Sequence, residues 1–140
     1  ASALRILGNK VDFLSIIGRD TASDAVRRAL VKDGHSDQFI IDNMPHTAQS
    51  VILYDRTGRR QIHTDLKNIQ DRVYPVPRFK QVLQRCSFAV LCNINYNRPL
   101  LALAKDAAIP IATDVHTIAE IEDAYNRDYM AAAHILFMSD

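Results

Sequence analysis

Cysteine, glycine and tryptophan are all scarce in this sequence, which has two cysteines, four glycines and no tryptophan among its 140 residues. The two thiols, Cys86 and Cys92, are too few for a thiolate metal set or a disulfide framework, so we expect a protein of the reducing cytoplasm. No apolar run approaches the length of a membrane-spanning helix, and residues 1–8 are too short and too mixed for a secretory signal. We therefore expect no membrane partner.

An excess of charge of one sign is also absent, since 17 basic residues face 16 acidic residues and the net charge is +1. This balance gives no reason to expect a nucleic-acid partner. The hydrophobic share of 48% and the charged share of 24% are ordinary for a soluble globular protein. We expect residues 1–140 to form one incomplete α/β domain, because residues 1–7 resemble the last turns of a helix that Gly8 caps.

Several well-known site motifs are missing as well. The sequence has no glycine-rich P-loop, no G-x-G-x-x-G turn, no H-E-x-x-H and no G-x-S-x-G. Its five histidines lack the spacing of metal ligands. His116 alone among them follows a predicted strand, where it is either a site residue or the first residue of a helix. We therefore do not expect the kinds of site that these motifs form.

Buried strands that alternate with amphipathic helices are the main pattern present. The hydrophobic spacing predicts strands over residues 11–17, 38–42, 88–92, 109–113 and 135–138. It predicts helices over residues 21–32, 77–85, 98–108 and 117–132. Such an alternation predicts a mainly parallel sheet with right-handed crossovers.

Residues 47–66 interrupt this alternation with a predicted β-hairpin around Arg56-Thr57-Gly58. Its first arm is largely apolar, whereas the second arm, residues 61–66, is half polar. We therefore expect an antiparallel ribbon with one open face.

Polar side chains follow four of the predicted strands, and the carboxyl ends of parallel strands meet at one edge of a sheet. Such an edge is where α/β proteins bind ligands, although Asp, Asn and Ser also favour turns and helix caps, and both interpretations stay open. The residues are Arg19 and Asp20, Asn93 and Asn95, Asp114 and His116, and Ser139 and Asp140.

Taken in order, several short motifs resemble those of the ribokinase-like (PfkB-type) carbohydrate kinases. Ile17-Gly18-Arg19-Asp20 is similar to the family's hydrophobic-G-x-D turn, and Thr47-Ala48-Gln49 to the entry of its lid strand. Asp55 to Arg60 resembles its D-x-x-G-E-R hairpin turn, with Arg59 in place of the acidic residue. The last four residues resemble the approach to its N-x-x-E motif, with Asp140 in place of the asparagine.

The resemblance implies a doubly wound, mainly parallel sheet in which the hairpin 47–66 is a lid over a sugar. It implies transfer of the γ-phosphoryl group of ATP to a sugar hydroxyl with Mg²⁺. On the same basis Asn95, Gln49 and Arg60 are expected on the sugar side, and Asp140 near the nucleotide phosphates and the metal. A homodimer through the open face of the ribbon is also implied.

The family's catalytic aspartate and anion-hole segment, D-x-x-G-A-G-D, does not occur in the sequence and is expected beyond Asp140. The chain thus resembles the central part of such a kinase, and we expect it to be inactive alone. The sugar remains open among ribose, fructose, a ketodeoxy acid and a nucleoside. Two alternatives are a non-catalytic α/β ligand-binding or regulatory module and a doubly wound domain of another enzyme.

Overall fold

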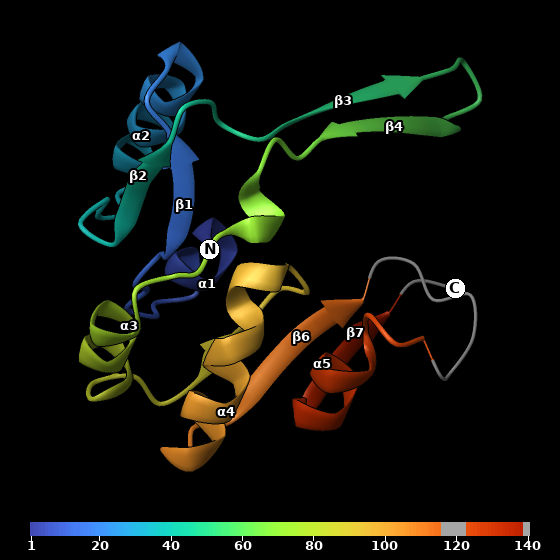
Figure 1. Cartoon of the computed structure of the whole chain (residues 1–140). Helices are drawn as coiled ribbons and strands as arrows, with labels where there is room; N and C mark the ends of the chain where they lie inside the picture. Colours follow the sequence, from blue (N-terminus) through green and yellow to red (C-terminus); the bar gives the residue numbers. More distant parts are fainter. Residues whose placement is uncertain (116–122, 139–140) are drawn as a thin grey trace. The chain divides into compact units, whose positions relative to one another are not determined.

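The computed structural model describes residues 1–115 and 123–138, which Figure 1 traces from the N-terminus to the C-terminus. The chain divides into two compact units, Ala1–Gln70 and Asp71–Asp140, and each is described by itself. Among the described residues, no helix combines the length and the apolar character needed to cross a membrane.

The first unit is built around one parallel strand–helix–strand crossover. Helix α1 (Ser2–Ile6) precedes strand β1 (Ser15–Gly18), helix α2 (Thr21–Lys32) and strand β2 (Ile40–Met44). The two strands pair in parallel, with Ser15 opposite Ile40 and Ile16 opposite Ile41. The buried core of the unit includes Ile16, Ile17, Phe39, Ile40 and Met44.

Left-handed glycines end both helices of this unit. At the end of α2, Gly34 has φ +74°, and its amide donates to the Val31 carbonyl while the His35 amide donates to the Leu30 carbonyl. Gly8, with φ +86°, closes α1 in the same way. These paired bonds define a Schellman motif and satisfy the carbonyls at the helix ends. The cap expected at Gly8 is confirmed, as is the helix over residues 21–32.

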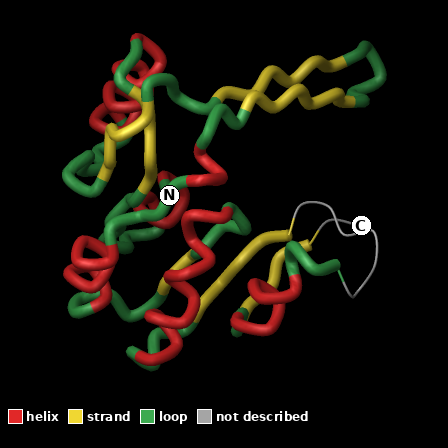
Figure 2. The backbone as a smooth tube through the Cα atoms, in the orientation of Figure 1, coloured by secondary structure: helices red, strands yellow, loops and turns green. Residues whose placement is uncertain are grey.

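The antiparallel hairpin of strands β3 (Gln49–Tyr54) and β4 (Arg60–Asp65) extends the first unit, and a short 3₁₀ helix, η1 (Ile69–Asp71), follows it (Figure 2). The Asp55 carboxylate shapes the turn, since its Oδ1 accepts from the Thr57 amide at 2.8 Å and from the Arg59 amide at 3.0 Å. Every residue of both strands is exposed. The expectation of one open face was therefore wrong, because the described residues bury neither face of the ribbon.

The second unit is a three-stranded parallel sheet with helices packed on it. Its order along the chain is helix α3 (Val76–Leu83), strand β5 (Ala89–Val90), 3₁₀ helix η2 (Asn95–Asn97), helix α4 (Arg98–Asp106), strand β6 (Ile111–Val115), helix α5 (Arg127–Ala132) and strand β7 (Ile135–Met138). The strand order is β5-β6-β7. Helices α4 and α5 contact each other and also β6, so they cover the same face of the sheet (Figure 1).

The last predicted helix, residues 117–132, differs from the structure. Residues 116–122 lie outside the described residues, and residues 123–126 form a turn, so that α5 begins only at Arg127. The cause is Asp123, whose Oδ1 accepts from the backbone amides of Tyr125 at 2.8 Å and Asn126 at 3.2 Å. An aspartate that bonds the amide two residues later favours a turn over a continuous helix.

Parallel pairing within each unit confirms the α/β class with parallel sheets. Strand β7 has the predicted bounds, whereas β2 and β6 are shifted by two residues from the predicted ranges. Two strands are shorter than predicted, since β1 begins at Ser15 and β5 comprises only Ala89 and Val90.

Candidate functional site

The turn after β1 is organised around the carboxylate of Asp20. Its Oδ1 accepts from the Ser23 amide at 3.0 Å and from the Thr47 hydroxyl at 2.7 Å, and its Oδ2 accepts from the Thr47 amide at 2.8 Å. The bond to Ser23 caps α2, and the bonds to Thr47 attach the segment that leads into β3. The sequence leaves Asp20 as either a site residue or a helix cap, and in the structure its carboxylate caps α2.

These bonds stabilise the ionised form of Asp20. Donation from the backbone amide and the hydroxyl of Thr47 holds the pKa of the Asp20 carboxyl below its ordinary value. Nδ1 of His46 lies 3.9 Å from the carboxylate and lowers that pKa slightly further. The Thr47 hydroxyl in turn accepts from the Gly18 amide at 3.0 Å, so the chain of bonds reaches back to the end of β1.

Gly18 is required here because of space and not because of its φ angle. A Cβ at this position would lie 2.3 Å from the His46 carbonyl carbon and 2.3 Å from the Thr47 amide nitrogen. Backbone atoms at that distance cannot move aside as a flexible side chain can. The Gly-x-Asp turn therefore permits close backbone approach and provides a helix cap.

In the second unit, the carboxyl ends of β5 and β6 carry Asn93, Asn95 and Asp114. The Cys92 thiol lies beside the Asp114 carboxylate, and burial together with that negative charge raises the pKa of the thiol. Asn95 is half-buried and is the first residue of η2, in the loop that follows β5. The structure thus brings the polar ends of two neighbouring parallel strands to one edge of this sheet.

The other predicted strand-end residues of this unit, His116, Ser139 and Asp140, lie outside the described residues. Within residues 1–115 and 123–138, no group of three or more His, Cys, Asp or Glu side chains has an arrangement that could hold a metal ion. The nucleotide and Mg²⁺ role of Asp140 stays a prediction.

Gln49 and Arg60, the two predicted lid residues, lie on opposite faces of the ribbon. Directly paired residues of an antiparallel pair share a face, and successive residues alternate between faces. Gln49 pairs with Asp65, whereas Arg60 pairs with Tyr54, five residues further along β3 than Gln49. The two side chains therefore cannot contact one ligand from a single face.

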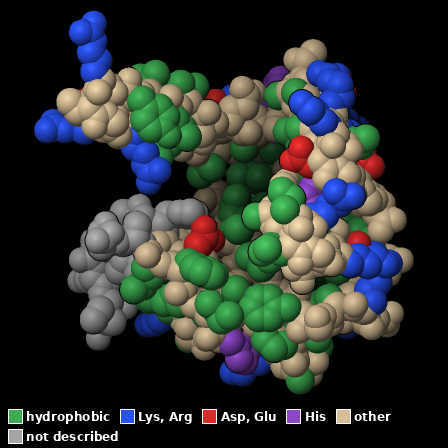
Figure 3. Space-filling view, turned by 180° about the vertical axis from the view of Figure 1, so that it is seen from behind, with side chains coloured by type: hydrophobic (Ala, Val, Ile, Leu, Met, Phe, Trp, Pro, Cys, Tyr) green, Lys and Arg blue, Asp and Glu red, His purple; other side chains and the backbone are tan. Residues whose placement is uncertain are grey.

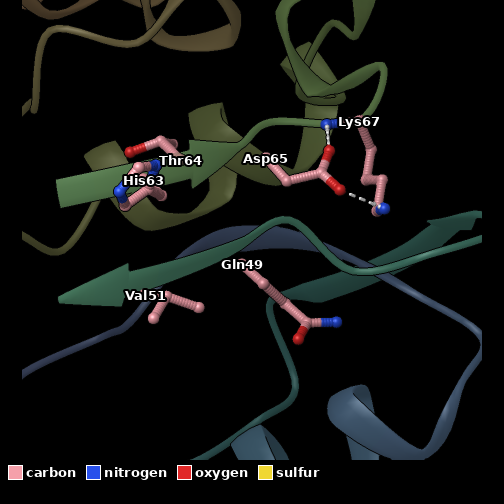
Figure 4. Close-up of a pocket in the computed structure, with 6 residues that line it drawn as sticks. All are labelled: Gln49, Val51, His63, Thr64, Asp65 and Lys67. Carbon is pink, nitrogen blue, oxygen red and sulfur yellow. Dashed lines mark hydrogen bonds and ion pairs between the residues drawn. The ribbon is translucent and has the colours of Figure 1, made fainter. Parts of the chain in front are cut away.

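An open hollow of about 380 Å³ lies beside Gln49, and Figure 4 shows it in close-up. The face of Gln49 carries the exposed apolar residues Val51 and Leu53 as well as polar side chains. Asp65 at its rim is paired with Lys67. The residues that line the hollow are Gln49, Val51, His63, Thr64, Asp65 and Lys67.

The opposite face of the ribbon carries the polar residues Ser50, Arg60 and Thr64 and the apolar residues Ile52, Tyr54 and Ile62. These apolar side chains are 46%, 66% and 48% exposed, respectively. In Figure 3 the ribbon presents apolar side chains along its length and Lys and Arg side chains near its end.

No motif in the sequence points to Tyr125 and Tyr129, although both side chains reach the loop after β5. The Tyr125 hydroxyl donates to the Asn93 carbonyl at 2.9 Å, and the Tyr129 hydroxyl donates to the Ile94 carbonyl at 2.6 Å. These contacts join residues more than thirty positions apart, and no local sequence signal indicates them.

The protein is thus of the α/β class, with parallel strands in each unit, polar loops at the strand ends and an exposed antiparallel ribbon. No family model matches the sequence, and no curated protein matches it. Solved structures do match the fold. A microbiome-derived acarbose kinase is 21% identical over 98% of the chain, with a TM-score of 0.83.

Two further solved structures match at similar coverage. A fructokinase from Xylella fastidiosa with bound ATP is 17% identical over 97% of the chain, with a TM-score of 0.79. A nucleoside kinase from Burkholderia thailandensis in complex with inosine is 15% identical over 97%, with a TM-score of 0.73. The chain therefore has the ribokinase-like fold of the PfkB-type carbohydrate kinases. It spans about half the length of these structures, namely 46%, 47% and 45% in the order given.

The first prediction concerns Gly18. Gly18→Ala is expected to lower the free energy of unfolding by about 2–3 kcal/mol, because the added methyl group overlaps the backbone at His46 and Thr47. Gly58→Ala is the matched control: Gly58 has φ +83° but open space around it, so only backbone strain of about 1 kcal/mol is expected. Urea unfolding measures both variants, and an equal loss in the two would contradict the close-approach role of Gly18.

The second prediction concerns Asp20 and pH. A carboxyl whose pKa is lowered on folding stabilises the protein above its unfolded pKa of about 3.9, and the stabilisation is lost as pH falls through the folded pKa. Asp20→Asn should therefore be less stable than the wild type at pH 7, and this difference should shrink below pH 4. Thr47→Val removes one donor and should lose part of the same dependence. A deficit that is equal at pH 7 and pH 3 in urea unfolding would refute the assignment.

Proposed function

We propose that the full-length protein containing this chain is an ATP-dependent sugar kinase that phosphorylates a sugar hydroxyl. The fold likeness to the acarbose kinase, with a TM-score of 0.83 over 98% of the chain, is the observation that carries the proposal. The fructokinase structure with bound ATP supports ATP as the phosphoryl donor. The non-catalytic binding module gains no support, since the matching structures described above are kinases.

The further expectations of the resemblance are part of this proposal. Residues 1–140 belong to one incomplete, doubly wound α/β domain, with hairpin 47–66 as its lid. The protein is a cytoplasmic homodimer, Mg²⁺ accompanies ATP near Asp140, and the general base and the anion hole lie beyond Asp140. Because a missing general base alone lowers a rate by about 10²–10⁴-fold, the 140 residues alone are inactive.

Asn95 is the proposed acceptor-binding residue of the second unit. It lies in the loop at the carboxyl end of β5, where parallel α/β sheets bind their ligands. Its amide can donate to one hydroxyl and accept from a neighbouring one, which suits the vicinal hydroxyl groups of a sugar.

The two faces of the ribbon suggest a division of roles. Gln49 and His63 lie on one face and line the hollow, whose polar side chains offer hydrogen-bonding groups to a sugar. Ile52 and Ile62 form a directly opposed apolar pair on the other face, the kind of surface that a second subunit covers. On this assignment Gln49 faces the sugar, whereas Arg60 faces the subunit interface.

The third prediction tests the activity and Asn95 together. The full-length protein should phosphorylate at least one of ribose, fructose, 2-keto-3-deoxygluconate, inosine and acarbose with ATP. Asn95→Ala should raise KM for that acceptor by about 10-fold while leaving KM for ATP unchanged, because only the acceptor loses a hydrogen bond. Asn43→Ala, at an exposed position on β2, is the control. Absence of turnover with every acceptor would count against the proposed function. Equal changes in the KM values for acceptor and ATP would count against the role of Asn95.

The fourth prediction separates the two ribbon faces. Gln49→Ala should raise KM for the acceptor about 3- to 10-fold, whereas Arg60→Ala should leave it within 2-fold, because the two side chains lie on opposite faces. Steady-state kinetics of both variants provide the measurement. A larger rise in KM from Arg60→Ala than from Gln49→Ala would reverse the assignment of the faces.

A further inference from the structure

The loop after β5, residues 93–97, is held by side chains from the segment that begins α5. As described above, the hydroxyls of Tyr125 and Tyr129 donate to the Asn93 and Ile94 carbonyls. In addition, the Asn93 amide nitrogen donates to the Asn126 side chain at 2.8 Å. Three hydrogen bonds thus join two consecutive loop residues to one short segment of the same unit.

Arg98, the first residue of α4, fixes the orientation of both tyrosines. Its guanidinium carbon lies 5.1 Å from the ring centre of Tyr125 and 5.0 Å from that of Tyr129. One nitrogen, Nη1, pairs with the Asp128 carboxylate at 2.6 Å, and Nη2 donates to the Tyr125 carbonyl at 2.8 Å. A planar cation against two aromatic rings is a preferred arrangement for arginine, so the rings are held as well as the hydroxyls.

Tyr129 is fully buried, with 0% of its surface exposed. Burial raises the pKa of its hydroxyl well above the ordinary value, and this effect outweighs the opposing influence of Arg98. The hydroxyl therefore stays protonated, and remains a donor to the Ile94 carbonyl, throughout the pH range in which enzymes work.

The loop is also bonded to itself. The Ile94 amide donates to the Cys92 carbonyl at 2.8 Å, and the Asn97 amide donates to the Ile94 carbonyl at 2.8 Å. The Asn97 side chain adds a bond to the Cys92 carbonyl at 2.9 Å. The Ile94 carbonyl thus accepts two bonds, one from within the loop and one from Tyr129, directly before Asn95 in the chain.

We propose that Tyr129, together with Tyr125 and Arg98, is a positioning residue that preorganises the loop 93–97 so that Asn95 meets the acceptor without rearrangement. This inference rests on the proposed function, which makes Asn95 an acceptor-binding residue. A loop that is ordered before the ligand arrives loses little conformational entropy on binding, and the entropy saved strengthens binding. None of the three positioning residues needs to touch the acceptor itself.

Tyr129→Phe in the full-length protein removes the hydroxyl and keeps the ring against Arg98. The amides of Ile94 and Asn97 should then exchange with deuterium at least 5-fold faster, and KM for the acceptor should rise about 3- to 10-fold with KM for ATP unchanged. Ile111→Val is the control for a general loss of core packing, because Ile111 is equally buried in the same unit but lies at the amino end of β6, where it pairs with Ala89. It should change neither measurement.

Tyr125→Phe provides a second variant at a partly exposed position, should Tyr129→Phe reduce the folded yield. It should accelerate exchange in the loop and raise KM in the same direction by a smaller factor. Unchanged deuterium exchange of the loop amides in both variants would contradict the positioning role of the two tyrosines.

Failure of the positioning role and failure of the proposed function give different results. In one outcome, Tyr129→Phe accelerates exchange in the loop but leaves KM for the acceptor unchanged, while Asn95→Ala raises that KM. The positioning role is then wrong, and the acceptor site at Asn95 stands. If the wild-type protein phosphorylates no acceptor of the panel, the proposed function fails. The positioning role then fails as well, even if the exchange data show that Tyr125 and Tyr129 stabilise the loop.

Discussion

The bonds between Asp20 and Thr47 are the interaction on which the first unit depends. A single carboxylate ends the turn after β1, caps α2 and fixes the chain where it leaves β2. The ribbon begins two residues later, at Gln49. Its starting point is therefore set by a cap and not by contacts along the ribbon. Gly18 makes this arrangement possible, because any larger residue would push the Thr47 backbone away from the carboxylate.

The second unit solves the same physical problem with different chemistry. A loop that leaves a parallel strand has carbonyls and amides that no neighbouring strand pairs, and these groups need partners. In the first unit one acidic side chain satisfies amides, whereas in the second unit the hydroxyls of Tyr125 and Tyr129 satisfy carbonyls. In both cases the partner comes from a later segment of the chain. The strand-end loops are thus held by tertiary bonds, which suits loops expected to present side chains to a ligand.

Local sequence signals predicted the elements that local physics controls. The helix 21–32 has an aspartate before it and a glycine after it, and the structure reproduces both its ends. The helix predicted over residues 117–132 is interrupted by a turn before Arg127, because the turn-forming bonds of Asp123 outweigh the apolar spacing. The hydrogen bonds that hold Asn93 could not be predicted, since its partners Tyr125 and Asn126 lie more than thirty residues away in the sequence. The order of motifs indicated the fold correctly where no single motif was specific.

The ribbon shows why pattern alone left its role open. Its two arms predict a hairpin, but only the register reveals that Gln49 and Arg60 lie on opposite faces. Each face mixes polar side chains with exposed aliphatic ones, namely Val51 and Leu53 on one face and Ile52 and Ile62 on the other. A two-stranded ribbon with Ile52 and Ile62 exposed gains little stability by itself, because an isolated hairpin buries almost no apolar area. A ribbon of this composition therefore gains stability when other surfaces cover its exposed apolar side chains.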